Sequence, residues 1–565
     1  MKAIKYTLFI SIAVVMHSLP FGEGWGGVYA QKVLKDTMLH VVKSFQPTIA
    51  DAYKMNEMPV VKDSVPPIPQ LSYSINPKKI NTAFVVEPLK PAKMQGEPLT
   101  KLYNSLVKVG AGNYNTPYAE IFYNNLRSKE MSYGTHLKHL SSQSTLDGGG
   151  YSGFSDNEIG LYGKKFLRKH TVTANLDYTR SVVHYYGYNT SLNTVIDNDI
   201  IKQIYGKIGG DVSLQSHFTD SVQPNYLFNL KYYNLSDNYN TSENYVNATG
   251  EASAYYEKQL IHVPLNIDYY NNQSYKDTGY TTIVTLAPYM LSSGEKWNTR
   301  IGIGLTTDAE KDQKTRFLFY PNIDFNYNVL ENIIVPYAGI SGGLKKNSLL
   351  SLTGENPFLV PGPSLKNTNE KWQVYAGVKG SISKNVSYNA RTYYSKLENM
   401  YFFINDDHDI FRKGFNTLYD DATLWNVHGE LQFQYNEKIK VLAKGDYNKY
   451  SMTYEASPWM RPLWQTTLSA NYNLKNKIIV IADIFVYGKR DAKIYATDPL
   501  DPNVSVSTSI ELKTLFDANL GLEYRYSKKL SGFINFNNLG FSRYGLYNNY
   551  NTQRFNFLLG VSMAF

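Results

Sequence analysis

Apolar and polar residues alternate with a period of two along most of this chain. The last eleven residues, 555–565, show the pattern most clearly: Phe555, Phe557, Leu559, Val561, Met563 and Phe565 share one parity, and the positions between them are mostly small or polar. Only a β-strand has this period, because successive side chains leave opposite faces of the pleat. A final strand with one continuous apolar face and an aromatic last residue is typical of barrels in the bacterial outer membrane.

This terminal strand also predicts how the protein is inserted. We expect its apolar face to be the signal that the outer-membrane assembly machinery reads during insertion, which assigns that role to Phe557, Leu559, Val561, Met563 and Phe565.

The same alternation recurs between residues 101 and 565, separated by turns rich in Lys, Asn and Ser. Lys384-Asn385 and Lys475-Asn476 each divide two alternating segments, which predicts hairpins with short turns. Longer connections are predicted at residues 344–370, 405–423 and 490–508. Short turns on one side and long loops on the other are expected of an outer-membrane barrel.

These segments predict an all-β protein, a transmembrane antiparallel outer-membrane β-barrel of about 18–22 strands with roughly 10 residues per crossing. The mean hydropathy of −0.37 agrees, because a polar lumen and polar loops offset the apolar lipid face. The 49 tyrosines, often in pairs such as Tyr232-Tyr233 and Tyr393-Tyr394, predict aromatic girdles at the membrane surfaces. The β-propensity of tyrosine is the alternative explanation.

Residues 1–30 are predicted to be a secretory signal peptide. Lys2 and Lys5 precede an apolar run of about ten residues, too short to span a bilayer, and Ala30 offers a small residue for cleavage. The chain has no cysteine, which excludes a lipid anchor on cysteine, disulfides and thiolate chemistry.

Residues 31–100 are predicted to be a Pro-rich extended periplasmic tail, since they hold nine of the chain's 23 prolines. We expect the tail to bind periplasmic protein partners, with the apolar–acidic motif Ala83, Phe84, Val85, Val86 and Glu87 as the docking segment. The same motif faintly resembles the segment that receptors offer to the energy-coupling protein TonB.

Two regions resemble the barrels of TonB-dependent outer-membrane receptors of the Bacteroidetes. Asn537-Asn538-Leu539-Gly540, Tyr544 and the terminal Gly560–Phe565 resemble their last two strands, and 370–404 resembles the middle of their barrels. The resemblance implies the barrel architecture. The glycine-rich motifs of the family's plug domain are not recognisable in this sequence, so energy-driven import is not implied.

Candidate chemistry is sparse. Asp406, Asp407 and Asp409 could bind a divalent cation through carboxylate oxygens, although the spacing lacks the glycines of a calcium loop and a solvated loop is the alternative. His136 and His139 lie three residues apart in a predicted strand, so they face opposite sides and cannot share a metal. No catalytic motif is present and no cofactor is expected, which argues against an enzyme.

The net charge of +9 predicts either a lumen that favours anions or contacts with lipid phosphates. Outer-membrane lipid and lipopolysaccharide are expected partners, and without a basic stripe nucleic-acid binding is not expected. The function predicted from these features is an accessory or structural subunit of an outer-membrane assembly, secretion or uptake complex. A passive diffusion porin and a TonB-dependent transporter for a small or glycan-derived solute remain alternatives.

Overall fold

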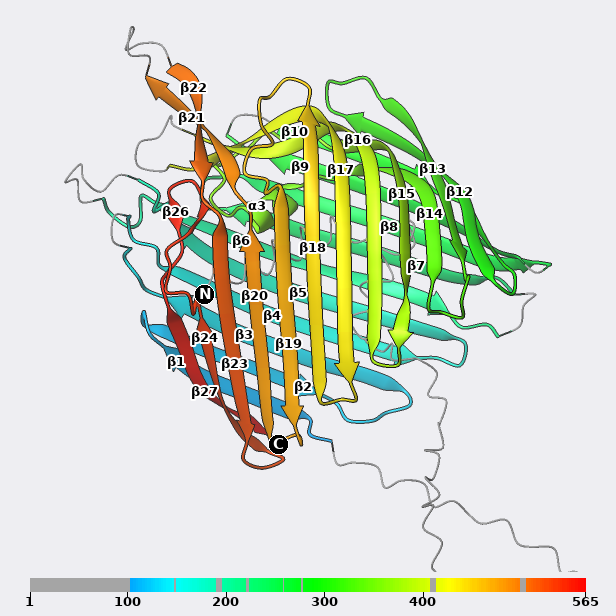
Figure 1. Ribbon diagram of the computed structural model, residues 1–565, viewed down its shortest axis with the longest axis horizontal. Coiled ribbons are helices and arrows are strands. Elements are labelled where there is room, and N and C mark those ends of the chain that lie inside the picture. The colour runs from blue at the N-terminus through cyan, green and yellow to red at the C-terminus, as the bar shows by residue number, and fades with distance from the viewer. Residues whose placement is uncertain are drawn as a thin grey trace, which may run out of the picture. The chain divides into compact units, whose positions relative to one another are not determined.

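The computed structural model describes residues 102–565, except for 147–148, 189–195, 220–222, 258, 276–277, 407–412 and 498–504. Most of this described part is β-strand, and α3 (Leu349–Glu355) is its one α-helix (Figure 1). No helix of the described residues is long and apolar enough to cross a membrane. The predicted signal peptide (1–30), tail (31–100) and docking motif Ala83–Glu87 lie outside the described residues.

The strands follow one another around a single antiparallel sheet. Its first half consists of β1 (Ser105–Gly112), β2 (Thr116–Asn124), β3 (Met131–Ser142), β4 (Phe154–Phe166), β5 (His170–His184), β6 (Lys202–Ser216), β7 (Asn225–Asp237), β8 (Ser242–Tyr256), β9 (Gln259–Gln273), β10 (Thr278–Leu286), β11 (Tyr289–Ser293), β12 (Trp297–Glu310) and β13 (Arg316–Tyr327). Its second half consists of β14 (Val335–Lys345), β15 (Thr368–Ser383), β16 (Val386–Asn405), β17 (Phe415–Tyr435), β18 (Ile439–Met452), β19 (Trp464–Leu474), β20 (Ile478–Tyr487), β23 (Leu515–Arg525), β24 (Leu530–Asn537) and β27 (Asn556–Ala564).

The sheet closes on itself, as predicted. β27 pairs with β24 on one side and with β1 on the other, so that Val561 lies opposite both Gly532 and Val109. β10 and β11 both pair with β9 and β12, so they are two parts of one interrupted crossing. The 23 strands of the sheet therefore make a closed barrel of 22 crossings, the upper end of the predicted range.

The outer surface of the barrel is apolar. On β27 the predicted outward residues Leu559, Val561 and Met563 are half exposed, and Leu176 at the middle of β5 is 61% exposed. A soluble protein rarely exposes a contiguous apolar surface of this extent, whereas lipid covers it at no cost in desolvation. Together with barrel closure, which leaves no unpaired edge in lipid, this places the protein in the bacterial outer membrane.

The paired tyrosines do not belong to the girdles as pairs. Tyr232 is 48% exposed and Tyr233 only 4%, and likewise Tyr394 is 45% exposed and Tyr393 only 6%. Neighbours on a strand face opposite sides, so one tyrosine of each pair points into the lumen. Tyr232 and Tyr394 therefore face outward, as a girdle requires, and their partners do not, while the position of a girdle along the barrel stays a prediction.

The two ends of the barrel differ in their connections. The predicted short turns Lys384-Asn385 and Lys475-Asn476 lie at the same end as the first residues of β1 and the last of β27. The opposite end carries the long connections 346–367, 488–514 and 538–555. Outer-membrane barrels have short periplasmic turns and long extracellular loops, so the latter end is the extracellular mouth.

Two predicted loops were wrong in part. Residues 405–423 are mostly strand, because β17 already begins at Phe415, and residues 490–508 include a two-stranded hairpin of β21 (Arg490–Thr497) and β22 (Ser505–Leu512). A second small ribbon, β25 (Gly545–Tyr547) with β26 (Tyr550–Asn551), lies in the connection before β27. The polar composition of these segments indicated loops, but strands that extend above the membrane have no lipid face and lose the apolar signal.

Candidate functional site: the closed mouth of the barrel

The connection between β14 and β15, residues 346–367, folds into the mouth of the barrel, and we call it the strap. It begins with α3, whose first turn is capped by Ser348: the Ser348 side chain accepts a hydrogen bond from the Ser351 N–H at 3.1 Å. Leu349 and Leu352 of this helix are 4% and 1% exposed, so the helix buries its apolar side within the mouth (Figure 1).

The strap is anchored first to β8 and β9, which are five and four crossings away from β14 in the sheet. The Glu243 carboxylate of β8 accepts the backbone N–H groups of Leu349 at 2.7 Å and Leu350 at 3.2 Å. Lys346 forms an ion pair with Asp268 of β9 at 2.6 Å. These contacts satisfy the free N–H groups of the first helical turn with a carboxylate, an arrangement that stabilises a helix start.

Two tyrosines extend the anchoring further around the wall. Tyr205 of β6 donates a hydrogen bond to the carbonyl of Pro357 at 3.1 Å, and Tyr185, just after β5, donates to that of Leu359 at 2.6 Å. Since both hydroxyls are buried, their loss would leave buried carbonyls unsatisfied. The strap therefore crosses the mouth between distant parts of the barrel wall.

Glu355, the last residue of α3, is the point where other extracellular segments hold the strap. Arg461, from the connection between β18 and β19, pairs with its carboxylate at 2.9 Å, and Tyr401 of β16 donates to the same carboxylate. Tyr547 of β25 donates to the Glu355 carbonyl at 2.8 Å. Three segments distant in sequence thus converge on one residue.

The ionisation of these groups favours the closed arrangement. Burial by itself would lower the pKa of Arg461, but the Glu355 carboxylate and Tyr401 raise it above its ordinary value. Burial also raises the pKa of Tyr547 far above its ordinary value, and the charge of Glu355 adds to the effect. Arg461 therefore stays charged and Tyr547 keeps its donating proton at any physiological pH.

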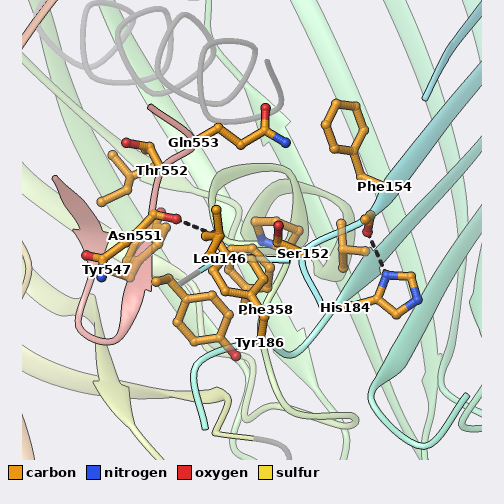
Figure 2. Close-up of a pocket in the computed structure, with 15 residues that line it drawn as sticks. Leu146, Ser152, Phe154, His184, Tyr186, Phe358, Tyr547, Asn551, Thr552 and Gln553 are labelled. Carbon is orange, nitrogen blue, oxygen red and sulfur yellow. Dashed lines mark hydrogen bonds between the residues drawn. The ribbon is translucent and has the colours of Figure 1, made fainter. Parts of the chain in front are cut away.

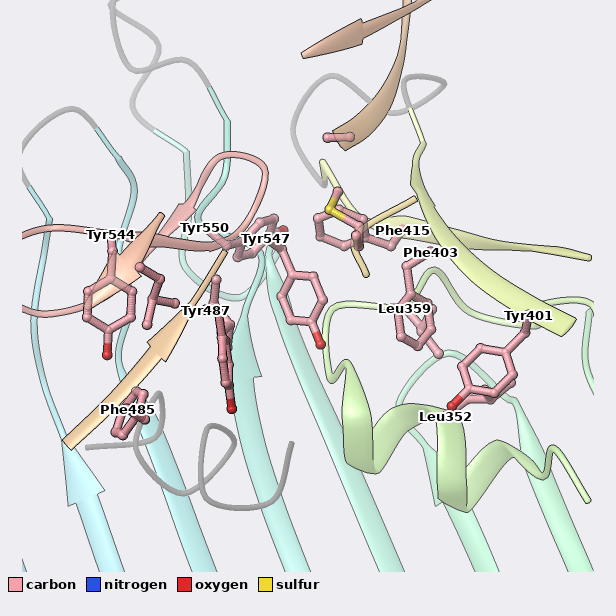
Figure 3. Packing of buried hydrophobic residues seen from close by; sticks show 14 residues of the cluster. Leu352, Leu359, Tyr401, Phe403, Phe415, Phe485, Tyr487, Tyr544, Tyr547 and Tyr550 are labelled. Atoms are coloured by element: carbon pink, nitrogen blue, oxygen red, sulfur yellow. The ribbon is translucent and has the colours of Figure 1, made fainter. Parts of the chain in front are cut away.

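An aromatic cluster packs above the strap. Figure 3 shows Leu352 and Leu359 of the strap among residues from the other extracellular segments. Its buried members are Leu352, Leu359, Tyr401, Phe403, Phe415, Met460, Phe485, Tyr487, Ala492, Leu515, Tyr544, Leu546, Tyr547 and Tyr550. Burial of this much apolar surface, at about 25 cal/mol per Å², holds the segments together more strongly than any single hydrogen bond among them.

A small pocket lies beside this cluster (Figure 2). Its wall combines Phe154, His184, Tyr186, Phe358 and Tyr550 from four different segments, and His184 Nδ1 lies 2.6 Å from the Gly153 carbonyl. The pocket encloses about 50 Å³, enough for a few water molecules. A drug-sized ligand needs roughly 300 Å³ or more, so a site for one would form only after the loops move.

The predicted metal site finds no support in the part of the chain that the structure describes. Asp407 and Asp409 lie outside it, and the backbone N–H of Asp406 donates to Gly414. The described residues contain no group of three or more His, Asp or Glu side chains arranged to hold a metal ion. The carboxylate of Asp420, in β17, accepts the backbone N–H of Glu455 at 2.8 Å and so fixes a neighbouring loop.

The two histidines on β3 face opposite sides, as predicted. His136 contacts Glu120 at 3.0 Å, and His139 contacts Asn157 at 2.8 Å. The terminal residues Phe557, Leu559, Val561, Met563 and Phe565 form one outward face, but their role as an assembly signal remains a prediction.

The strap and its anchors were not predicted from the sequence. Glu243, Glu355 and Arg461 are separated by more than a hundred residues and carry no local motif. The one available signal was the apolar content of the predicted loop, where Leu349, Leu352 and Leu359 are unusual for a segment in water.

Comparison with solved structures supports the barrel. No protein-family model and no curated protein sequence matches this chain. The siderophore receptor PirA of Acinetobacter baumannii is 10% identical with a TM-score of 0.63, covering 83% of this chain and 81% of that one. The FrpB iron transporter of Neisseria meningitidis is 9% identical with a TM-score of 0.62, covering 83% and 82%.

The ferric-catecholate import receptor Fiu of Escherichia coli K12 is 11% identical with a TM-score of 0.61, covering 82% of each chain. At these identities the likeness establishes the fold alone. The chain thus has the barrel fold of outer-membrane receptors, which agrees with the architecture implied by the sequence resemblance.

Proposed function

We propose that this protein is a gated receptor-type barrel of an outer-membrane uptake system, whose mouth is shut by its own loops until a solute or partner moves them. The observation that carries the proposal is the strap: it is anchored to Glu243 on one side of the mouth and to Arg461 on the other. A segment fixed to both sides of the mouth obstructs the lumen until these anchors are released. The descriptions of the structural neighbours as receptors and transporters support a role in uptake and argue against an enzyme.

The solute is not identified by the pocket in Figure 2, because its enclosed volume is too small for one. Its aromatic wall, with Tyr186, Phe358 and Tyr550, fits a ligand that presents flat or apolar faces once the loops separate. A small or glycan-derived solute is compatible with that chemistry.

An accessory subunit of an outer-membrane complex is the second candidate. The hairpin β21–β22 favours it, since it extends beyond the barrel strands and exposes Val506 and Ile510 (Figure 1). Both candidates predict that the isolated chain does not conduct, and they differ in whether it has a stable protein partner.

The test is the conductance of the purified full-length chain in planar bilayers, together with identification of what co-purifies from native membranes. We expect closed barrels, with brief openings at most. Steady conductance of the unmodified chain would show a porin and overturn the proposal. A stable complex that stays closed when solutes are added would favour the accessory role.

A further inference from the structure

The base of the β21–β22 hairpin contacts two of the three segments that hold Glu355, which are β25 and the connection between β18 and β19. Arg490, the first residue of β21, is 5% exposed and donates to the carbonyls of Leu546 at 2.7 Å and Gly545 at 2.8 Å. These carbonyls belong to β25, whose Tyr547 donates to the Glu355 carbonyl. One chain of contacts therefore runs from Arg490 through β25 to the strap.

A second chain of contacts runs through the connection between β18 and β19. Lys493 of β21 pairs with Glu455 at 2.8 Å, and its ammonium group lies 5.8 Å from the ring centroid of Trp459. The indole N–H of Trp459 donates to the same Glu455 carboxylate at 2.7 Å. Glu455 and Trp459 are thereby fixed close to Arg461 in the same connection.

Asp491 adds two more bonds to that connection. Its side chain accepts from the hydroxyl of Ser457 at 2.9 Å, and its carbonyl accepts from the backbone N–H of Met460 at 2.8 Å. Met460 directly precedes Arg461, the ion-pair partner of Glu355. The hairpin base thus fixes the backbone on which Arg461 depends for its position.

We propose that the hairpin base is the control point of the mouth: Arg490 and Lys493 position two of the three segments that hold Glu355, so that displacing the hairpin releases the strap. This rests on the proposed gated function and adds where the opening force is applied. An isolated two-stranded hairpin is marginally stable, so this one is held in place mainly through its base. A force on its exposed part is transmitted to the two contact chains.

The proposal is testable because the chain contains no cysteine, so a single introduced cysteine reports on one position. Leu352→Cys places a thiol at a site that is 1% exposed while the strap is closed. The rate of its reaction with a maleimide reagent measures how often the strap opens. Ser351→Cys, at an exposed position of the same helix, controls for intrinsic thiol reactivity.

We expect Arg490→Ala and Lys493→Ala each to raise the labelling rate of Leu352→Cys by about tenfold, a coupling of the size usual between linked sites. Lys489→Ala is the matched control: it removes the largely exposed pair at 2.7 Å between Lys489, the residue before β21, and Glu511 of β22. This variant is expected to leave the rate unchanged. Arg490→Lys, which cannot reproduce the two-carbonyl contact, should fall between wild type and Arg490→Ala.

A double variant tests whether the path ends at Glu355. In a Glu355→Gln background the ion pair with Arg461 is already lost, so adding Lys493→Ala, which acts through the connection that carries Arg461, should change the labelling rate little. Full additivity would show that Lys493 acts elsewhere. Equal rates for Arg490→Ala, Lys493→Ala and Lys489→Ala, with Glu355→Gln still fast, would overturn the proposal.

The readout separates this inference from the gated function. Labelling reports strap exposure and conductance reports the pore, so a strap that opens without conductance would refute the function but leave the hairpin linkage standing. Heat-dependent migration on gels confirms that each variant has folded as a barrel.

Discussion

The two ends of the lumen are built from the same strands but filled differently. At the extracellular mouth the described residues leave cavities of about 50, 80 and 30 Å³ between the strap and its neighbours. At the periplasmic end a cavity of about 450 Å³ lies against β1, β20, β23, β24 and β27, lined in part by Ile481, Phe533 and Lys528. The barrel wall does not cause the difference, because its alternation is the same at both ends. The loops cause it, since among the connections between described strands those long enough to fold inward lie at the mouth.

The largest expected effect comes from removing the strap, which closes the mouth and has no counterpart among the described turns at the other end. Replacing residues 349–363 with a short Gly-Ser linker should raise single-channel conductance about tenfold or more, because an unfilled barrel of this size encloses a wide lumen. Exchanging the Lys475-Asn476 turn at the other end for Asn-Gly is the control and should leave conductance unchanged. If the strap-less barrel stays closed, the mouth is not the barrier.

Breaking the ion pair between Glu355 and Arg461 at the mouth should have the second largest effect. Glu355→Gln leaves Arg461 charged and buried. Removing one partner of a buried ion pair in this way costs about 3–5 kcal/mol. We expect the opening free energy of the strap, measured by hydrogen exchange at its amides, to fall by about this amount. The double variant Glu355→Gln with Arg461→Met should recover a large part of the loss. An unchanged exchange pattern in the single variant would show that the aromatic cluster alone closes the mouth.

Side chains of β5 face lipid and lumen alternately, so substitutions on this one strand compare the two environments. Leu176→Arg places a charge against lipid near the middle of β5 and should reduce stability in bilayers by about 2–4 kcal/mol, whereas Thr173→Arg, on the luminal side, should change it little. Denaturant titration of the folded fraction in vesicles measures both. Equal losses would mean that the two faces are assigned wrongly.

The smallest effect is expected from a single hydroxyl. Tyr547→Phe removes the bond to the Glu355 carbonyl and keeps the ring in the cluster, which should cost about 1 kcal/mol of strap stability. Hydrogen exchange at α3 is the measurement. Tyr495→Phe, on the hairpin, serves as a control and should leave α3 unchanged.

Local patterns predicted the barrel well because the alternation of apolar and polar residues is visible within each strand. The hairpin around Lys384-Asn385 and the alternation of residues 555–565 were recognisable without knowing their neighbours. The segment 415–423 was misjudged, because a strand that extends beyond the membrane loses its lipid-facing residues and is composed like a loop.

The sequence by itself determined that the chain is a barrel and which side chains face lipid, since a period of two fixes both from local information. Tertiary structure alone decided that the mouth is closed. That closure depends on Glu243, Glu355, Arg461 and Arg490, whose partners come within reach only after the sheet has closed and brought distant loops together. An ion pair between segments a hundred residues apart leaves no periodic trace in a sequence, because its geometry is set by the wall that carries it.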